Sequence, residues 1–295
     1  MSTLPMIFGP IGLGCVTFGR EIDEAASFAL LDHAWERGIR FLDTAAAYGG
    51  GASESIVGAW LAARRARPGS PVVATKLLPP YTPATLEAGL TASLGRLRLA
   101  SVDVLYLHRW DSTATEPATL RALDEFVRSG RVGRLGLSNV TAEQLAPLLQ
   151  LQAELGLSTF RVVQNNHNLA VRDVDAAMLK LAAWHEFAVV TYSPLAAGFL
   201  TGKHQGGAAA GTRFELIPGH QKVYFHDEAF RRLAHLQAVA ARTGHAPTHL
   251  ALAWALHQPG IATVLVGGRT PAHLEQAFAA LQFDDPALFA ELSSS

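Results

Sequence analysis

The sequence predicts an α/β fold, a closed (β/α)8 TIM barrel, and three observations support this fold class. Eight short apolar runs recur along the 295 residues. Most of them lack the alternation of apolar and polar residues that is typical of a sheet with one solvent-exposed face. Amphipathic stretches with helix start and stop signals separate these runs. The length also suits eight strand–helix units, which typically need about 250 residues. A doubly wound open sheet is the alternative that the same pattern allows.

The eight apolar runs are the expected strands of the barrel. Each is short and rich in β-branched residues, as strands covered on both faces are. They span Ile11 to Cys15, Arg40 to Thr44, Pro71 to Lys76, Val102 to His108, Arg134 to Asn139, Val162 to Asn166, Ala188 to Pro194 and Thr263 to Gly268.

Between the runs lie the expected helices. Several open on proline or on a capping residue and close on glycine, which is the usual asymmetry of helix ends. They span Asp23 to Arg37, Thr82 to Leu97, Glu116 to Ser129, Thr141 to Glu154, Asp173 to Glu186 and Pro271 to Leu281.

Two segments interrupt the alternation of strand and helix. Met1 to Pro10 is expected to form a short hairpin that closes the bottom of the barrel. Leu195 to Ala262, between the seventh and eighth strands, is expected to form a long loop with extra helices. This loop opens with a Gly/Ala-rich, mobile stretch, Gly198 to Gly211, and continues with helices over Asp227–Arg242 and Pro247–His257. No composition break marks a boundary, so residues 1–295 are expected to form a single domain.

Composition argues against several functional classes. The net charge is −1 and 49% of residues are hydrophobic, so nothing favours nucleic acid or an anionic membrane as a partner. Cys15 is the one cysteine, and no signal peptide is recognisable at the N-terminus, so we expect a cytoplasmic protein. His220 and His226 lack metal-ligand spacing, and we expect no metal. The partner is expected to be a small molecule, and the sequence does not define the oligomeric state.

Four ionisable side chains fall at or just after the C-terminal ends of predicted strands. Asp43 ends the second strand and Tyr48 follows on its loop, while Lys76 ends the third strand and His108 the fourth. Taken singly, each has a plain structural explanation, such as a helix cap, a solvated lysine or a core histidine. Burying all four on one rim is costly unless they pair, and such clusters are where perturbed pKa values are used.

Such a cluster has a definite chemistry. An ammonium such as Lys76 stabilises a phenolate and lowers the pKa of Tyr48, while Asp43 holds the ammonium in place. Tyr48 then becomes a general acid that can protonate a developing alkoxide, and His108 can donate a hydrogen bond to the same oxygen. No side chain supplies hydride, so a nicotinamide or similar cofactor is implied.

At this point the sequence resembles a known family, the aldo-keto reductase superfamily. The match runs in order from about Gly12 to Leu281. It consists of FLDTAAAY (41 to 48), GASE (51 to 54), ATK (74 to 76), DVLYLHR (103 to 109), GRVGRLGLSN (130 to 139), YSPLAAGFLTGK (192 to 203) and VLVGGRTPAHLEQ (264 to 276).

The resemblance implies a barrel that reduces aldehydes or ketones with a 4-pro-R hydride from NAD(P)H, with Tyr48 as proton donor and Asp43 and Lys76 as its partners. It implies that His108 positions the substrate carbonyl, that Ser138, Asn139 and Gln164 hold the nicotinamide carboxamide, and that Tyr192 stacks on the ring. It also places other residues around the cofactor. These are Gly14 and Cys15 beside it, and Ser193, Leu195, Gly198 and Lys203 around its pyrophosphate.

The adenosine end of the expected cofactor site follows the eighth strand. Gly267 and Gly268 would bring backbone amides close to phosphate, and Arg269 suits a ribose 2′-phosphate, which favours NADP(H). The helix that follows departs from the family at His273 and Gln276, and at Ala277, so NAD(H) stays open. The absence of a GxGxxG motif disfavours a Rossmann domain.

The expected substrate is a small carbonyl or alcohol compound. Phe18, Tyr81 and Trp110, on loops leaving the active face, are expected to form an apolar substrate wall with Tyr48 and His108. Tyr224 or Phe225 was expected to join this wall.

Three other functions remain open from the sequence. One is a sugar or lactol dehydrogenase running in the oxidative direction. Another is a non-catalytic nicotinamide-binding regulator, like the potassium-channel β subunits, although the intact set of four argues against it. The third is an isomerase or lyase that uses Lys76 as a Schiff base, which would leave Ser138 and Asn139 unexplained.

Overall fold

A computed structural model of the chain describes residues 8–64, 69–204, 207, 211 and 213–294. Eight parallel strands form one closed barrel in sequence order, which confirms the predicted fold class. The strands are β1 (Ile11–Gly14), β2 (Phe41–Asp43), β3 (Val72–Leu77), β4 (Val102–Leu107), β5 (Val132–Ser138), β6 (Phe160–Asn166), β7 (Ala188–Tyr192) and β8 (Thr263–Val266).

The barrel closes because β1 pairs with β8, with Gly12 opposite Leu265. Its interior is packed with side chains from several strands, among them Phe41, Tyr106 and Val190. Phe8 joins this interior cluster, with its ring centroid 4.3 Å from that of Phe41. The hairpin expected at Met1 to Pro10 lies mostly outside the described residues, so only its end, at Phe8, can be placed.

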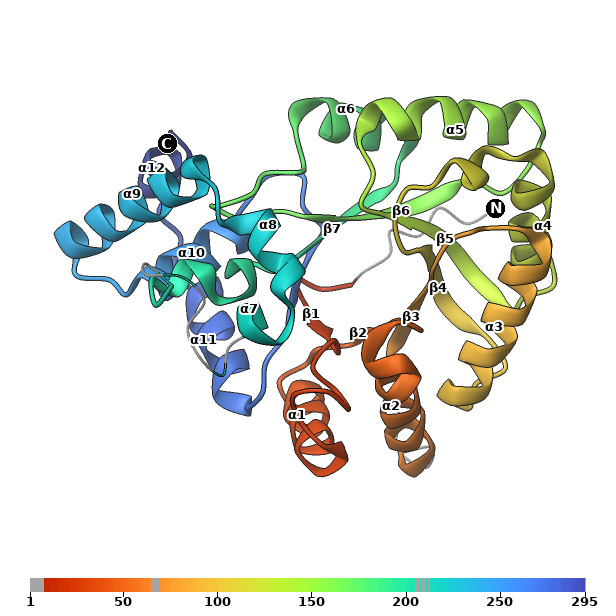
Figure 1. The fold of residues 1–295 in the computed structure, drawn as a ribbon, viewed down its shortest axis with the longest axis horizontal. Helices are drawn as coiled ribbons and strands as arrows, with labels where there is room; N and C mark the ends of the chain where they lie inside the picture. The colour runs from red at the N-terminus through yellow and green to blue at the C-terminus, as the bar shows by residue number, and fades with distance from the viewer. Residues whose placement is uncertain (1–7, 65–68, 205–206, 208–210, 212, 295) are drawn as a thin grey trace.

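Helices surround the barrel, and α7 to α12 gather on one side of it (Figure 1). The α-helices are α1 (Glu24–Glu36), α2 (Ala52–Ala63), α3 (Pro83–Leu97), α4 (Pro117–Arg128), α5 (Ala142–Glu154), α6 (Ala176–His185), α7 (Arg213–Leu216), α8 (Gln221–Tyr224), α9 (Asp227–Thr243), α10 (Pro247–Leu256), α11 (Pro271–Leu281) and α12 (Pro286–Ser293). Short 3-10 segments are η1 (Tyr48–Gly51), η2 (Ser112–Thr115), η3 (Ala196–Thr201) and η4 (Pro218–His220).

Capping side chains define where the helices start. Thr82 and Thr141 each form a reciprocal capping box at the start of α3 and α5. The sixth helix was expected from Asp173 but begins at Ala176, because Asp175 accepts a hydrogen bond of 2.8 Å from the Met178 amide.

Helix α2 was not among the helices expected from the sequence. Its centre holds Gly58, a residue that weakens helix propensity. The structure explains this glycine, because a Cβ there would lie 2.3 Å from the carbonyl oxygen of Arg96 at the end of α3. Close packing of α2 on α3 therefore requires a residue that local propensity disfavours.

The insertion between β7 and β8 contains η3, α7, η4, α8, α9 and α10, so the extra helices are present. Its first part is a 3-10 segment over Ala196–Thr201, within which Ala197 and Gly198 have left-handed φ angles of 56° and 96°. Part of the predicted mobile stretch Gly198 to Gly211 lies outside the described residues.

Candidate active site

The C-terminal ends of β2 and β3 bring three of the predicted residues into direct contact. Asp43 is the last residue of β2, and its Oδ1 accepts a hydrogen bond from the Nζ of Lys76 on β3. The same Nζ donates to the carbonyl of Thr44 at 3.0 Å and lies 3.3 Å from the Oη of Tyr48 on η1. The ammonium therefore sits between a carboxylate and a phenol.

Both members of the Asp43–Lys76 pair are buried, with 1% of each residue exposed. Burial lowers the pKa of Lys76, but the charge of Asp43 and the oxygen of Tyr48 outweigh it and raise that pKa overall. Lys76 thus keeps its proton at neutral pH. An ammonium 3.3 Å from the Tyr48 oxygen stabilises the phenolate that forms when the phenol gives up its proton.

His108 follows β4 and faces Tyr48. The two ring centroids are 5.7 Å apart with the rings edge to face. Burial, together with the charges of Lys76 and Arg109, lowers the pKa of His108 to about 3, so the imidazole is neutral at physiological pH. Its Nδ1 is buried and has no hydrogen-bond partner among the described residues. A neutral imidazole has one N–H to donate and one nitrogen to accept, which suits it to orient a carbonyl oxygen.

Polar side chains from β5, β6 and β7 continue the wall beyond Asp43. Gln164 Nε2 donates to Asp43 Oδ2 at 2.8 Å, and Ser138 Oγ donates to the Gln164 carbonyl at 2.7 Å. Asn139 Nδ2 donates to the His108 carbonyl at 2.9 Å, while its Oδ1 accepts from the Tyr192 hydroxyl at 2.6 Å. These bonds fix the side chains of three neighbouring strands relative to the catalytic candidates.

One cavity of about 670 Å³ opens over this wall. It extends from Tyr48 and His108 to the N-terminus of α11. Its lining includes most of the predicted cofactor residues, namely Gly14, Asp43, Ser138, Asn139, Gln164, Tyr192, Ser193, Leu195, Gly198, Lys203, Gly267, Gly268, Arg269, His273 and Gln276.

The far end of the cavity is basic. Lys203, Arg269 and His273 all line it, and burial with the two neighbouring cations lowers the pKa of His273. His273 Nδ1 accepts a hydrogen bond of 3.2 Å from the Arg269 amide. Gly198 lines the same cavity, and the Lys203 Nζ lies 3.8 Å from where a Cβ on Gly198 would stand. This donor set suits an anion such as a phosphate group.

Four predicted contact residues do not line this cavity, which corrects their assignment. Cys15 and Phe18 are fully buried, because the end of β1 turns them into the core, and burial raises the pKa of the Cys15 thiol. Tyr81 is also buried, and its hydroxyl donates to the Arg109 carbonyl at 2.8 Å, so it anchors a loop instead of contacting substrate. Trp110 packs against the hydrophobic core.

The alternative wall residues Tyr224 and Phe225 are likewise outside the cavity lining. Tyr224 is buried, and its hydroxyl donates to Asn166 Oδ1 at 3.2 Å. Phe225 belongs to an aromatic group with Phe199 and Phe214. Tyr224 therefore joins the insertion to β6, and Phe225 packs within the insertion.

Other residues line the cavity although the sequence did not predict them. Thr17 lines the cavity, and its Oγ1 donates to the Gly268 carbonyl at 2.9 Å, which joins the loops after β1 and β8. Glu21 lines the cavity with a side chain that is 2% exposed and pairs with Arg20. Nothing in the sequence around Arg20 and Glu21 indicates that Glu21 lines a cavity. Thr248 and Leu252 reach the cavity from α10.

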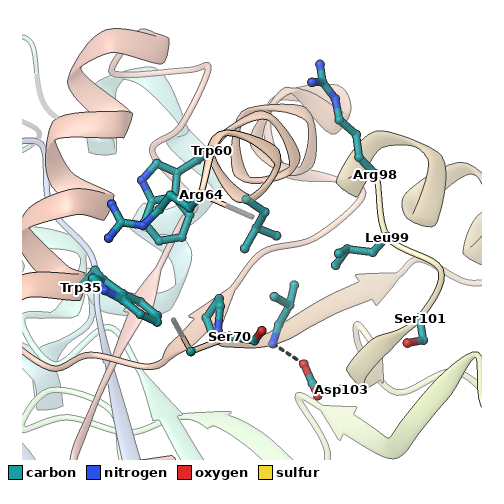
Figure 2. Close-up of a pocket in the computed structure, with 12 residues that line it drawn as sticks. Trp35, Trp60, Arg64, Ser70, Arg98, Leu99, Ser101 and Asp103 are labelled. Carbon is teal, nitrogen blue, oxygen red and sulfur yellow. Dashed lines mark hydrogen bonds between the residues drawn. The ribbon is translucent and has the colours of Figure 1, made fainter. Parts of the chain in front are cut away.

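A second cavity, of about 300 Å³, lies at the opposite end of the barrel, where β3 and β4 begin. Figure 2 shows Trp35, Trp60 and Arg64 on one side of it and Asp103 on the other. Asp103 Oδ2 accepts from the Val73 amide at 2.8 Å, and the Arg64 guanidinium lies 4.6 Å from the Trp60 ring centroid. These polar groups are used in holding strands and helices together.

The described residues contain neither a metal-binding cluster nor a membrane-spanning helix. No group of three His, Cys, Asp or Glu side chains in them could hold a metal ion. His226, one of the two histidines considered, caps α9 by accepting from the Ala229 amide at 3.3 Å. No helix in the described ranges combines the length and apolar character needed to cross a membrane.

With this geometry in place, comparison with known proteins gives the family. The model of the aldo/keto reductase family matches residues 10–288, so the chain belongs to that family and the resemblance seen in the sequence is confirmed. Family membership implies oxidoreductase activity, and members generally use NAD(P)H.

Similar proteins carry several names. A probable voltage-gated potassium channel subunit beta of Oryza sativa subsp. japonica is 31% identical over 267 residues, covering 85% of this chain and 80% of that protein. Norsolorinic acid reductase B of Aspergillus parasiticus is 30% identical over 293 residues, covering 90% and 74%. The aldo-keto reductase ausK of Aspergillus calidoustus is 29% identical over 299 residues, covering 92% and 74%.

The residues of the cavity fit a nicotinamide dinucleotide. The aromatic ring of Tyr192 and the hydroxyl and amide groups of Ser138, Asn139 and Gln164 line the cavity with Tyr48, and the basic groups stand at its other end. A dinucleotide carries its phosphates on the side away from the nicotinamide. Ala197 and Gly198, both with left-handed φ angles, line the same cavity and bring no large side chain into it. Charge and shape thus both suit this class of cofactor.

Proposed function

We propose that the protein reduces aldehydes or ketones to alcohols, reversibly, with NADP(H) as the preferred cofactor and Tyr48 as the proton donor. The observation that carries this proposal is the buried ammonium of Lys76, held between Asp43 and the Tyr48 oxygen on the wall of a cavity that His108 also lines. The bound cofactor supplies the hydride.

The chain's own residues handle the proton and the developing charge. Tyr48 Oη gives its proton to the carbonyl oxygen as negative charge develops there. The Lys76 ammonium, 3.3 Å away, stabilises the phenolate left behind, and Asp43 keeps the ammonium in place. Neutral His108 donates a hydrogen bond to the same carbonyl oxygen, which orients the substrate and stabilises its charge.

The preference for NADP(H) rests on the basic end of the cavity. Arg269 and Lys203 have no ion-pair partner among the described residues, and both line this end with His273. A ribose 2′-phosphate would supply the missing negative charge, and a guanidinium can grip it through two hydrogen bonds. NAD(H) offers its pyrophosphate to Lys203 but would leave Arg269 without a phosphate partner.

A second candidate is a nicotinamide-binding regulatory subunit, which the name of the rice relative favours. Such a protein would bind the cofactor but would not need a polarised acid beside it. The intact contact of Asp43, Lys76 and Tyr48 therefore favours catalysis.

The test is a titration of tryptophan fluorescence with NADPH and NADH, followed by a panel of aldehydes, ketones and sugars in the same solution. Tight binding with turnover supports the reductase, and tighter binding of NADPH supports the cofactor preference. Binding without turnover across the panel would favour the regulator. Failure to bind either nucleotide would contradict both candidates.

A further inference from the structure

Gln164 makes a contact that the proposed mechanism does not use. Asp43 has two carboxylate oxygens, and Oδ1 accepts from Lys76 while Oδ2 accepts from Gln164 Nε2 at 2.8 Å. An ionised carboxylate can only accept, so the NH2 end of the Gln164 amide must face Asp43 and its oxygen must face away. Gln164 is 2% exposed and lines the cavity, so the amide lies between Asp43 and the nicotinamide end of the site.

We propose that Gln164 is a positioning residue of the proton relay, which holds Asp43 so that the proton between Asp43 and Lys76 stays on Lys76. This rests on the proposed function, and it gives Gln164 a role separate from any contact with the nicotinamide carboxamide. Gln164 acts through Asp43 and Lys76, and it does not touch the reacting carbonyl.

The physical reason lies in the burial of the pair. A buried carboxylate becomes more basic unless hydrogen-bond donors stabilise its charge, and burial does raise the pKa of Asp43 against the opposing effects of Lys76 and Gln164. Without the donor from Gln164, Asp43 would draw the shared proton away from Lys76. Less positive charge would then remain beside Tyr48, and its phenolate would be less stable.

Four titratable groups around the relay are neutral near pH 7. Cys15, which follows β1, and Tyr106 on β4 lie within electrostatic range of Asp43, and the Lys76 Nζ is 5.7 Å from the Tyr106 ring centroid. Tyr192 on β7 lies within electrostatic range of Tyr48. Burial raises the pKa of each of these three groups, while His108 on β4 has its pKa lowered to about 3. Asp43 and Lys76 are thus the charged pair in contact with Tyr48, and Arg109 is a further cation whose charge acts on His108.

The most direct test is a titration of tyrosinate absorbance in Gln164→Leu and in the wild-type protein, each without cofactor or substrate. The chain has five tyrosines. Burial raises the pKa of the other four, to about 12 for Tyr81, so their transitions fall at high pH. Subtracting the titration of Tyr48→Phe in each background isolates the transition of Tyr48.

We expect the Tyr48 transition of Gln164→Leu to move upward by about one pH unit or more. An unchanged transition would overturn the proposal, and it would do so whether or not a substrate has been found. The proposed function is judged separately, by turnover of the wild-type protein.

Gln164→Glu provides a second variant with a distinct signature. At low pH the introduced carboxyl is protonated and its O–H can replace the lost donor to Asp43, whereas at higher pH its charge repels Asp43. We expect carbonyl reduction by this variant to recover towards the wild-type rate as the pH is lowered. A loss of the same size at every pH would contradict the proposal.

Tyr192→Leu is the matched control, because it removes an aromatic face of the nicotinamide end without touching Asp43. We expect this control to raise the KM for NADPH and to leave the pH limb of kcat where it is in the wild type. Gln164→Leu should instead move the pH-dependent part of the kcat profile to higher pH. If Gln164→Leu behaved like the control, Gln164 would act on the cofactor alone and the inference would fail.

Discussion

The charged side chains at the two ends of the barrel differ in their burial and in their hydrogen-bond partners. At the N-terminal end, around the cavity of Figure 2, Asp32 pairs with Arg64 and accepts from the Trp60 indole at 3.0 Å, while Asp103 holds the Val73 amide. At the C-terminal end, Asp43 and Lys76 are both buried, and His108 Nδ1 has no partner among the described residues.

The difference indicates that the charges at the N-terminal end stabilise the fold, whereas those at the C-terminal end serve the reaction. Charges at the N-terminal end join a strand or helix to its neighbour and keep part of their surface in water, so they cost little. Burying Asp43 and Lys76 costs several kcal/mol per ion before their attraction is counted. A chain tolerates that cost where the charge is needed by a reacting group, which for this family lies at the C-terminal ends of the strands.

The largest effect on the C-terminal end should come from Tyr48→Phe. Because general acid catalysis contributes about 10²–10⁴-fold, we expect kcat for carbonyl reduction to fall by that factor. Fluorescence titration should give nearly unchanged NADPH affinity. Turnover within a few fold of the wild type would show that another group donates the proton.

Breaking the buried pair should affect stability as well. Lys76→Met leaves Asp43 charged and unpaired, so we expect the free energy of unfolding to drop by about 3–5 kcal/mol in chemical denaturation. The double variant Lys76→Met/Asp43→Leu should regain most of that stability and none of the activity. If the double variant were as unstable as the single one, the cost would not come from the unpaired charge.

His108 should make stability depend on pH. Its pKa in the folded protein, about 3, lies below the usual 6.5, so only the unfolded chain takes up the proton as the pH falls from 6.5 towards 3. Stability is therefore fully present above pH 6.5 and is lost below it, by on the order of 2 kcal/mol at pH 5. His108→Asn should remove this part of the pH dependence, which denaturation at pH 7.5 and pH 5 would measure.

Arg269→Ala should act on cofactor choice alone. Removing the guanidinium should weaken NADPH binding by roughly tenfold, since a hydrogen bond to a charged group contributes about 1.5–3 kcal/mol. NADH, which lacks the 2′-phosphate, should bind as before. Equal losses for both nucleotides would show that Arg269 does not distinguish them.

The smallest effect is expected at the N-terminal end. Asp103→Ala removes the acceptor of the Val73 amide and should cost about 1 kcal/mol of stability, seen as a fall of roughly 2–4 °C in Tm. kcat/KM should not change. A marked loss of activity would break the separation of the two ends.

The sequence alone allowed the barrel and the four catalytic candidates to be predicted, for physical reasons. Strands that are buried on both faces have continuous apolar sequences, so the residue at which each strand ends can be recognised in the sequence. Asp43, Lys76 and His108 stand at those ends, and the closed sheet brings them to one rim.

Features that depend on long-range packing were not predictable. Helix α2 was not predicted because Gly58 in its centre lowers the helix propensity of the segment. The glycine is needed for close packing against α3, a contact that the local sequence does not indicate. Tyr81 was predicted to line the cavity but is buried, whereas Glu21 lines the cavity without having been predicted. The path of a loop determines which of its side chains reaches the cavity. The bond from Gln164 to Asp43 joins residues on β6 and β2, which are not neighbours in the sheet.

The measurement that tests the central claim most directly is the fate of a deuterium label. The protein would be incubated with NADPH deuterated at the 4-pro-R position and an aldehyde that it turns over, and the products analysed by mass spectrometry. We predict that the deuterium appears on the carbinol carbon of the alcohol and that Tyr48→Phe, with NADPH bound, yields almost none of this product. Deuterium retained on the oxidised nucleotide, or equal labelling by Tyr48→Phe, would contradict the account.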